Sequence, residues 1–123
     1  MIHSVVVVMP AFNAEKTLSP VVKGLRKSLP GAYIIGINDG SPDGTGALLR
    51  SVCDRTIEFP VNRGKGAALQ VGFAAALERN PAAVLTIDSD GQHDPAFAPS
   101  IVAALNTSHI SIGTRDLTGE QMP

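Results

Sequence analysis

Two aspartates separated by one residue, Asp88 and Asp90, form the part of the chain whose spacing most clearly suggests chemistry. They follow an apolar run at residues 82–87 that is typical of a buried strand, so we expect them on a loop just past its end. Carboxylates at that spacing can hold one hard cation, and Mg²⁺ or Mn²⁺ commonly combines one or two protein carboxylates with phosphate oxygens of a substrate. Such a cation makes a diphosphate a better leaving group. The pair therefore indicates an enzyme that acts on a nucleotide diphosphate.

The same two aspartates could instead be ordinary turn residues. Asp side chains hydrogen-bond to nearby backbone groups, and this makes Asp frequent in loops that have no chemical role. Taken alone, Asp88 and Asp90 fit that interpretation better than a metal site. The decision depends on which other residues share their end of the fold.

Polar loops also follow two other predicted strands. Pro10–Asn13 follows the first strand and Asp39–Asp43 follows the second. Asp39 stands directly at a strand end, where its carboxylate can accept the N–H of a nucleobase or a ribose hydroxyl. Ligands bind outside the carboxyl ends of parallel strands, so we expect these two loops and the loop at Asp88 to meet at one edge of the sheet.

Two further segments carry helix-start signals. The second loop continues to Thr45, and we interpret it as a tight turn in which Asp43 or Thr45 caps the next helix. Asn62–Gly66 opens another helix, where glycines allow close backbone approach and the helix N-terminus favours anions. Neither a P-loop nor a G-x-G-x-x-G fingerprint is present. Lys65 either reaches a base or phosphate or is solvated, and both interpretations stay open.

Strand and helix patterns alternate along the chain, which predicts an α/β fold. The predicted strands are Ile2–Met9, closed by Pro10, then Tyr33–Asn38, Arg55–Phe59, Ala83–Ile87 and His109–Gly113. Four helices are predicted between them. The first has an apolar face formed by Leu18, Val21, Val22, Leu25 and Leu29, and the second is short and lies near Ala47–Val52. The third, at Lys65–Leu77, is Ala-rich and closely packed, and the fourth begins at Asp94-Pro95. Alternation of this kind predicts a mostly parallel sheet with helices on both faces.

The composition supports one globular domain over residues 1–123. The chain has 123 residues, of which 44% are hydrophobic and 17% charged, so it can form a core. Its formal net charge of −1 provides no basic field for a nucleic acid. Cys53 is the single cysteine, which excludes an internal disulfide, and no segment has the pattern of a signal peptide or a membrane span.

Four ordered motifs together resemble glycosyltransferases of family two. The motifs are Pro10–Asn13, Asn38–Thr45, Asn62–Gly66 and Asp88–His93, and their order and spacing cover nearly the whole chain. The chain most resembles the branch that contains the dolichol-phosphate mannose synthases and the bacterial polyprenyl-phosphate glycosyltransferases. The resemblance implies a GT-A fold, a nucleotide-sugar donor, Mg²⁺ or Mn²⁺, and inversion at the anomeric carbon.

Carried over by position, the resemblance assigns Asp88–Asp94, which we name the aspartate loop, to the metal. It implies that Asp88, Asp90 and Gln92 hold the cation beside the donor diphosphate, with Asp90 as the catalytic residue. His93 is a candidate base, although packing within the loop is the more common role for such a histidine.

The resemblance also implies a nucleotide pocket and an acceptor contact. Asp39 would contact the donor base, and Arg115 would lie near the acceptor phosphate. The residues implied to bind the nucleotide-sugar are Pro10, Phe12, Asp39, Lys65, Asp88, Ser89 and Asp90.

The chain departs from the family pattern at two carboxylates. Ala14 stands where the family often has Glu, with Glu15 one place later, and Asn38 stands where the second loop usually begins with Asp. These departures affect the expected base and ribose contacts and leave the expected metal site intact.

The chain also ends soon after the fifth predicted strand, where the family continues with further strands and the rest of the acceptor site. We therefore expect a nucleotide-binding half that is inactive alone, with an open sheet edge that favours a homodimer. Any membrane contact would come from the missing C-terminal part, and the full-length protein would be cytoplasmic or at the cytoplasmic face of a membrane.

The resemblance implies that a sugar is transferred from a nucleotide-sugar to a polyprenyl (dolichyl or undecaprenyl) phosphate or a glycan. Two other functions are alternatives to this reaction. A nucleotidyltransferase would need a Gly-rich, Arg-containing loop after the first strand, which Pro10–Asn13 lacks. A fragment that binds a nucleoside diphosphate without any activity fits the short length. Binding without transfer would distinguish that fragment from the enzyme.

Overall fold

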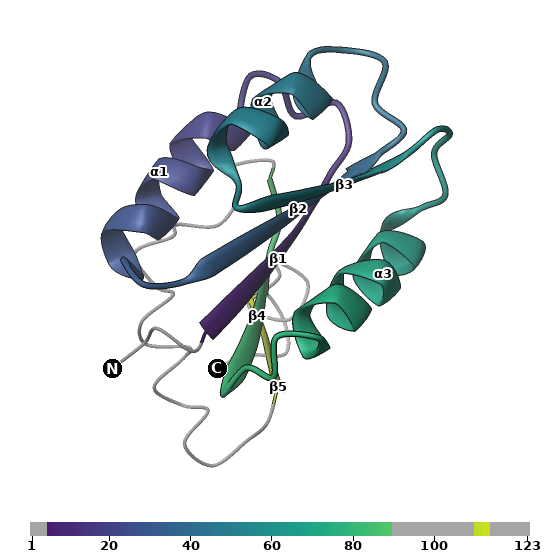
Figure 1. Ribbon diagram of the computed structural model, residues 1–123. Helices are drawn as coiled ribbons and strands as arrows, with labels where there is room; N and C mark the ends of the chain where they lie inside the picture. Colours follow the sequence, from purple (N-terminus) through teal and green to yellow (C-terminus); the bar gives the residue numbers. More distant parts are fainter. Residues whose placement is uncertain (1–4, 90–109, 114–123) are drawn as a thin grey trace.

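Parallel strands form a single sheet at the centre of the molecule (Figure 1). The computed structural model describes residues 5–89 and the strand at 110–113. Within these residues the sheet has five strands in the order β3-β2-β1-β4-β5. The strands are β1 (Val5–Ala11), β2 (Tyr33–Asp39), β3 (Arg55–Phe59), β4 (Ala83–Ile87) and β5 (Ile110–Gly113). All four neighbouring pairs are parallel, so the predicted α/β class with a parallel sheet is confirmed.

Strand β1 lies in the middle of the sheet, and its continuous apolar sequence follows from that position. All seven of its residues are buried. Val5, Val7 and Met9 join the core on one face of the sheet, and Val6 and Val8 join the core on the other. A strand covered on both faces cannot alternate apolar and polar residues, because each side chain enters a core.

Helices cover both faces of the sheet, as the alternation predicted (Figure 1). Helices α1 (Leu18–Ser28) and α2 (Thr45–Val52) lie on one face, and α3 (Lys65–Leu77) lies on the other. The predicted apolar stripe of α1 is buried at Leu18, Val21, Val22 and Leu25, and Leu29 just beyond the helix is buried as well. None of the described helices is both long and apolar enough to cross a membrane.

Helix α3 packs very closely on the sheet because it presents a glycine to it. A Cβ placed at Gly72 would lie 2.3 Å from Cγ1 of Val8 and 2.8 Å from Cδ1 of Ile37. Ala68, Ala75 and Ala76 complete the buried face of the helix. The expected close packing of this Ala-rich helix is therefore confirmed.

The expected end of the first strand at Pro10 is wrong, since β1 continues through Pro10 to Ala11. Pro10 pairs with Ile37 of β2, whereas the pairing of β1 with β4 ends at Val8 and Thr86. The carbonyl oxygen of Pro10 accepts a hydrogen bond from Ser89 Oγ. No residue of β4 pairs with Pro10, so its missing N–H removes no hydrogen bond to that strand. A proline lacks an N–H, and it fits a strand where that N–H is not needed.

The start of α2 also differs from the prediction. The helix begins at Thr45, earlier than the expected Ala47, and its N-cap is Gly44 instead of Asp43 or Thr45. The Asp43 carboxylate accepts hydrogen bonds from Thr45 N (3.1 Å) and Thr45 Oγ1 (2.6 Å), so it closes the turn just before the helix. The helix predicted to begin at Asp94 lies outside the described residues.

Candidate functional site

A pocket of about 210 Å³ opens at the carboxyl ends of β1, β2 and β4. Its lining comes from all three loops that the sequence placed at this edge and from the start of α3. The lining residues are Pro10, Ala11, Phe12, Asp39, Lys65, Asp88 and Ser89. Pockets that enclose a whole small ligand usually measure about 300–1,000 Å³, so the described residues form part of a site for a larger ligand.

The carboxylate of Asp88 forms an ion pair with the start of α3. Lys65 Nζ lies 2.7 Å from Asp88 Oδ1, with side chains 47% and 17% exposed, respectively. Asp88 follows β4 directly, and Lys65 is the first residue of α3, so sheet and helix each contribute one charge to the pocket. Lys65 therefore lines the pocket, and its contact with a base or phosphate stays a prediction.

Ser89, between the two aspartates, ties the aspartate loop to the centre of the sheet. It is 5% exposed, and its hydroxyl donates to the carbonyl of Pro10 at 3.0 Å. Its own carbonyl accepts a 2.7 Å hydrogen bond from Thr17 Oγ1 at the start of α1. The serine lines the pocket and also fixes where the loop leaves β4.

Asp39 is buried and already bound by three donors of the protein. Its carboxylate accepts hydrogen bonds from Arg63 N (2.7 Å), Gly64 N (3.0 Å) and Asn62 Nδ2 (3.1 Å). The sequence predicted that this carboxylate would face a ligand at the strand end. The structure places it in the pocket wall and adds partners from residues 62–64, which the sequence did not reveal.

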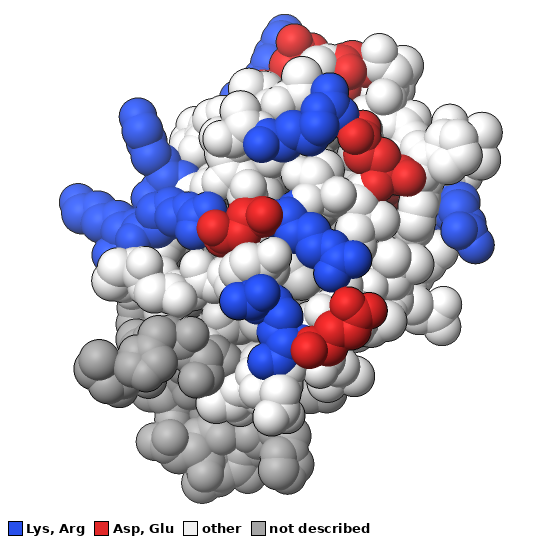
Figure 2. All heavy atoms as spheres, viewed as in Figure 1, with Lys and Arg blue, Asp and Glu red and all other residues white. Residues whose placement is uncertain are grey.

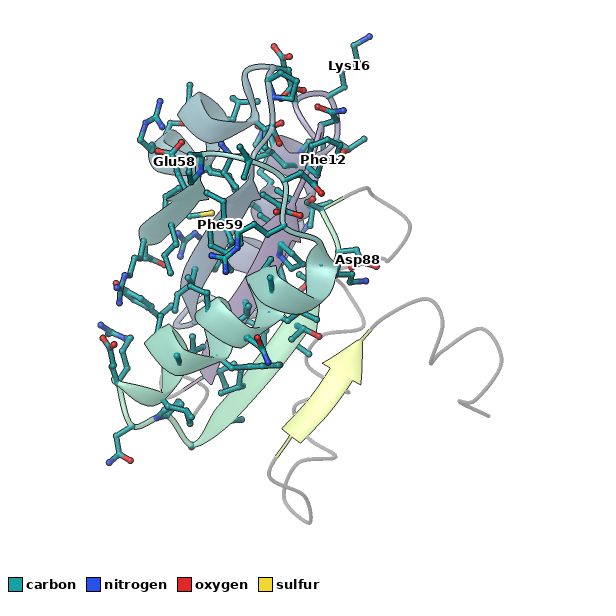
Figure 3. The ribbon with its side chains drawn as sticks, turned by 90° about the vertical axis from the view of Figure 1, so that its right-hand side faces the viewer. Phe12, Lys16, Glu58, Phe59 and Asp88 are labelled. Atoms are coloured by element: carbon teal, nitrogen blue, oxygen red, sulfur yellow. The ribbon has the colours of Figure 1, made fainter. Side chains whose placement is uncertain are left out.

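The loop after β1 brings an aromatic ring to the rim of the pocket. Phe12 is 47% exposed, and Figure 3 shows it at the same end of the sheet as Asp88. The next residue, Asn13, has a φ of 51° and donates its backbone N–H to Ser41 Oγ at 2.9 Å. A flat apolar surface held in this way can stack against a planar ligand group.

The residues at the two departures from the family pattern make hydrogen bonds to distant parts of the chain. The backbone N–H of Ala14 donates to Thr45 Oγ1 at 2.9 Å, while the Glu15 carboxylate accepts from Gly44 N at 3.2 Å, so both residues join the first loop to the second. Asn38 donates from Nδ2 to a carboxylate oxygen of Glu58 at 3.3 Å, which an aspartate could not do.

Charges of both signs are interspersed on the face of the described residues that Figure 2 shows. Figure 2 shows Lys and Arg side chains beside Asp and Glu side chains over the visible face. Arg26 pairs with Asp54, and Arg50 pairs with Glu58. The hydrogen bond from Arg50 lowers the pKa of Glu58, and the hydrogen bond from Thr45 Oγ1 lowers the pKa of Asp43. Both pairs and Asp43 lie outside the pocket lining.

The remaining predicted site residues lie outside the described part of the chain. They are Asp90, Gln92, His93 and Arg115. Within residues 5–89, no group of three or more His, Cys, Asp or Glu side chains comes close enough to hold a metal ion. Asp88 nevertheless presents a carboxylate in an open pocket at a strand end, and this hard oxygen donor suits Mg²⁺ or Mn²⁺.

Comparison with known proteins identifies a family and several named relatives. The family model described as "Glycosyl transferase family 2" matches residues 6–121. An undecaprenyl-phosphate mannosyltransferase of Micrococcus luteus is 31% identical over 96% of this chain and 51% of its own length. A polyprenol monophosphomannose synthase of Mycolicibacterium smegmatis is 31% identical over 92% of this chain and 45% of its own length. The chain thus spans about half the length of these relatives.

Solved structures agree with the fold. Glucosyl-3-phosphoglycerate synthase from Mycobacterium tuberculosis, crystallised with Mn²⁺ and uridine-diphosphate-glucose, superposes with a TM-score of 0.67 and 31% identity. The match covers 85% of this chain and 39% of that one. The same enzyme with phosphoglyceric acid gives a TM-score of 0.69 at 30% identity, over 85% of this chain and 40% of that one. The expected GT-A architecture is therefore confirmed.

Proposed function

Since the chain belongs to glycosyl transferase family 2, we propose that it forms the nucleotide-sugar-binding part of an enzyme that transfers a sugar to a polyprenyl phosphate. The observation that carries the proposal is the pocket in which Asp39, Lys65 and Asp88 meet at the carboxyl ends of the strands. The names of two relatives, an undecaprenyl-phosphate mannosyltransferase and a polyprenol monophosphomannose synthase, support the lipid-phosphate acceptor.

The chemistry of the lining suggests how the donor would lie. The exposed ring of Phe12 suits the nucleoside, and Pro10 and Asp39 line the same pocket. Lys65 and the aspartate loop suit the diphosphate, because an ammonium group attracts its negative charge. Binding of the donor would then require Lys65 to divide its charge between Asp88 and the phosphates.

The aspartate loop would hold Mg²⁺ or Mn²⁺ through Asp88, Asp90 and Gln92. A solved relative that contains Mn²⁺ and uridine-diphosphate-glucose supports this part of the proposal. The cation, when bound, would supply neutralising charge to the diphosphate leaving group. Asp90 stays the proposed catalytic residue on the strength of its place in the motif.

The sugar would be transferred with inversion. An acceptor oxygen attacks the anomeric carbon from the face opposite the diphosphate, the bond to the diphosphate breaks, and the nucleoside diphosphate leaves with its electrons. A lipid phosphate is already anionic, so it needs little help from a general base. Arg115 is proposed to hold that phosphate, and the reaction is proposed to occur at the cytoplasmic face of a membrane.

The alternative to sugar transfer is binding of a nucleoside diphosphate without activity. Because the chain spans about half of its relatives, it could bind the nucleoside diphosphate while the acceptor site lies elsewhere in a longer protein. The family match favours a glycosyltransferase over a nucleotidyltransferase.

A transfer assay on the whole protein that contains this chain tests the proposal. The protein is incubated with Mn²⁺, vesicles that contain undecaprenyl phosphate, and radiolabelled UDP- or GDP-sugars. We expect label in the lipid fraction and about a hundredfold slower transfer by Asp88→Asn, since loss of a leaving-group contact costs several kcal/mol in the barrier. Asp43→Asn, which lies outside the pocket, should transfer at the original rate. The absence of labelled lipid with every donor, or an unchanged rate in Asp88→Asn, would contradict the proposal.

A further inference from the structure

The buried carboxylate of Asp39 is bound by the segment that leads into α3. Oδ1 accepts from Arg63 N at 2.7 Å, and Oδ2 accepts from Gly64 N at 3.0 Å and from Asn62 Nδ2 at 3.1 Å. Asn62 Nδ2 also donates to the backbone carbonyl of Asp39 at 3.1 Å. A carboxylate has about four lone-pair positions, so most of the accepting capacity of Asp39 is used inside the protein.

The backbones of the two segments are in direct contact beside this carboxylate. Gly40 has a φ of +73°, and a Cβ placed on it would lie 2.3 Å from Asn62 N and 2.4 Å from the carbonyl carbon of Val61. No side chain fits there. The end of β2 and residues 61–64, which we name the 61–64 loop, therefore form one unit.

The 61–64 loop leads directly to Lys65, whose ammonium group lines the pocket. Gly64 has a φ of +95°, and α3 begins at the next residue, Lys65. Lys65 Nζ lies 2.7 Å from Asp88 Oδ1. The carboxylates at the ends of β2 and β4 are thus connected through the 61–64 loop and one lysine side chain.

We infer that Asp39 is a positioning residue, whose carboxylate fixes the 61–64 loop so that Lys65 is presented to the diphosphate side of the pocket. A carboxylate at the start of a helix also interacts favourably with the helix dipole, which further fixes the beginning of α3. In this role Asp39 affects the binding of every nucleoside diphosphate alike. Its effect on nucleotide binding rests on the proposed function, whereas its hold on the loop does not.

Amide hydrogen exchange, measured by NMR, tests the hold on the loop without any nucleotide. In Asp39→Asn, an NH₂ group replaces one acceptor in either orientation of the amide and opposes at least one of the three donors. We expect exchange at Arg63 and Gly64 to become at least about tenfold faster, with exchange within β1 unchanged. Asp43→Asn is the matched control, since its carboxylate closes the turn before α2 through Thr45, and it should leave both amides unchanged.

A second variant covers the case in which Asp39→Asn does not fold. Asn62→Ala removes the side-chain donor to Asp39, while the Arg63 guanidinium, 4.9 Å from the ring centre of Phe59, still anchors the loop. We expect exchange at Gly64 to become faster in this variant as well. Unchanged exchange at Arg63 and Gly64 in the folded variants would overturn the inference.

Nucleotide titrations then separate positioning from recognition of the base. We expect Asp39→Asn to weaken the binding of UDP, GDP and ADP by the same factor. In a Lys65→Met background the same substitution should weaken binding little further, because both substitutions remove the same function. A loss confined to one base, or losses that add fully in the double variant, would overturn the inference. If the wild-type chain binds none of these nucleotides while the exchange results hold, the proposed function fails and the hold on the loop stands.

Discussion

At the scale of single residues, the site is built from polar groups that bind one another across long stretches of sequence. Ser89 contacts Pro10 and Thr17, and Asp39 contacts residues 62–64. The sequence placed Asp39 and Asp88 correctly at strand ends, because a carboxylate after an apolar run is a local signal. It could not reveal their partners, because a hydrogen bond between distant residues depends on how the strands pair.

Cys53 gives a prediction at this scale. Burial raises the pKa of its thiol to about 12, from an ordinary value of 9.0. The thiolate is the reactive form, so we expect the native chain at pH 8 to react with a thiol reagent far more slowly than the chain in urea. Equal labelling rates in the two conditions would contradict this expectation.

The same shift makes stability depend on pH. Between pH 9 and 12 the unfolded chain loses the thiol proton and the folded chain keeps it, so the free energy of unfolding should fall as the pH rises through this range. The variant Cys53→Ala should lack this contribution, which urea titrations at several pH values would measure.

At the scale of secondary-structure elements, periodicity predicted the strands and helices but not all of their ends. β3, α3 and β4 have the predicted bounds, since each has turn or apolar signals at both ends. β1 runs past Pro10 because β2 still pairs with it there, and α2 starts at Thr45 because Asp43 closes the preceding turn. The first error arises where pairing with another strand overrides a local signal, and the second arises where a local hydrogen bond sets the start of the helix.

The contact between α3 and β1 gives a prediction at this scale. Gly72→Ala should destabilise the fold by about 1–3 kcal/mol, because the new methyl group would overlap the stiff side chain of Val8. Gly66→Ala, in the same helix, meets nothing within 4 Å and should be neutral or stabilising by up to about 1 kcal/mol. Urea midpoints of the two variants provide the measurement. Equal midpoints would show that α3 can move away from the sheet at little cost.

At the scale of the whole molecule, the parallel order of the strands brings three separate loops to one edge. The sequence predicted this convergence from alternation alone, and the pocket lined by Pro10, Asp39 and Asp88 confirms it. The helix expected after Asp94 and the acceptor contact at Arg115 lie outside the described residues. The homodimer through an open sheet edge stays a prediction.

The central claim is that the carboxyl edge of the sheet binds a nucleoside diphosphate together with a divalent cation. Calorimetric titration of UDP or GDP into the chain, with Mn²⁺ and again with EDTA, tests it most directly. We predict binding with Mn²⁺ that weakens at least about tenfold in EDTA and in Asp88→Asn or Asp90→Ala, while Asp43→Asn binds as the original chain does. Equal affinity with and without EDTA, or binding that survives both the Asp88→Asn and the Asp90→Ala substitution, would contradict the claim.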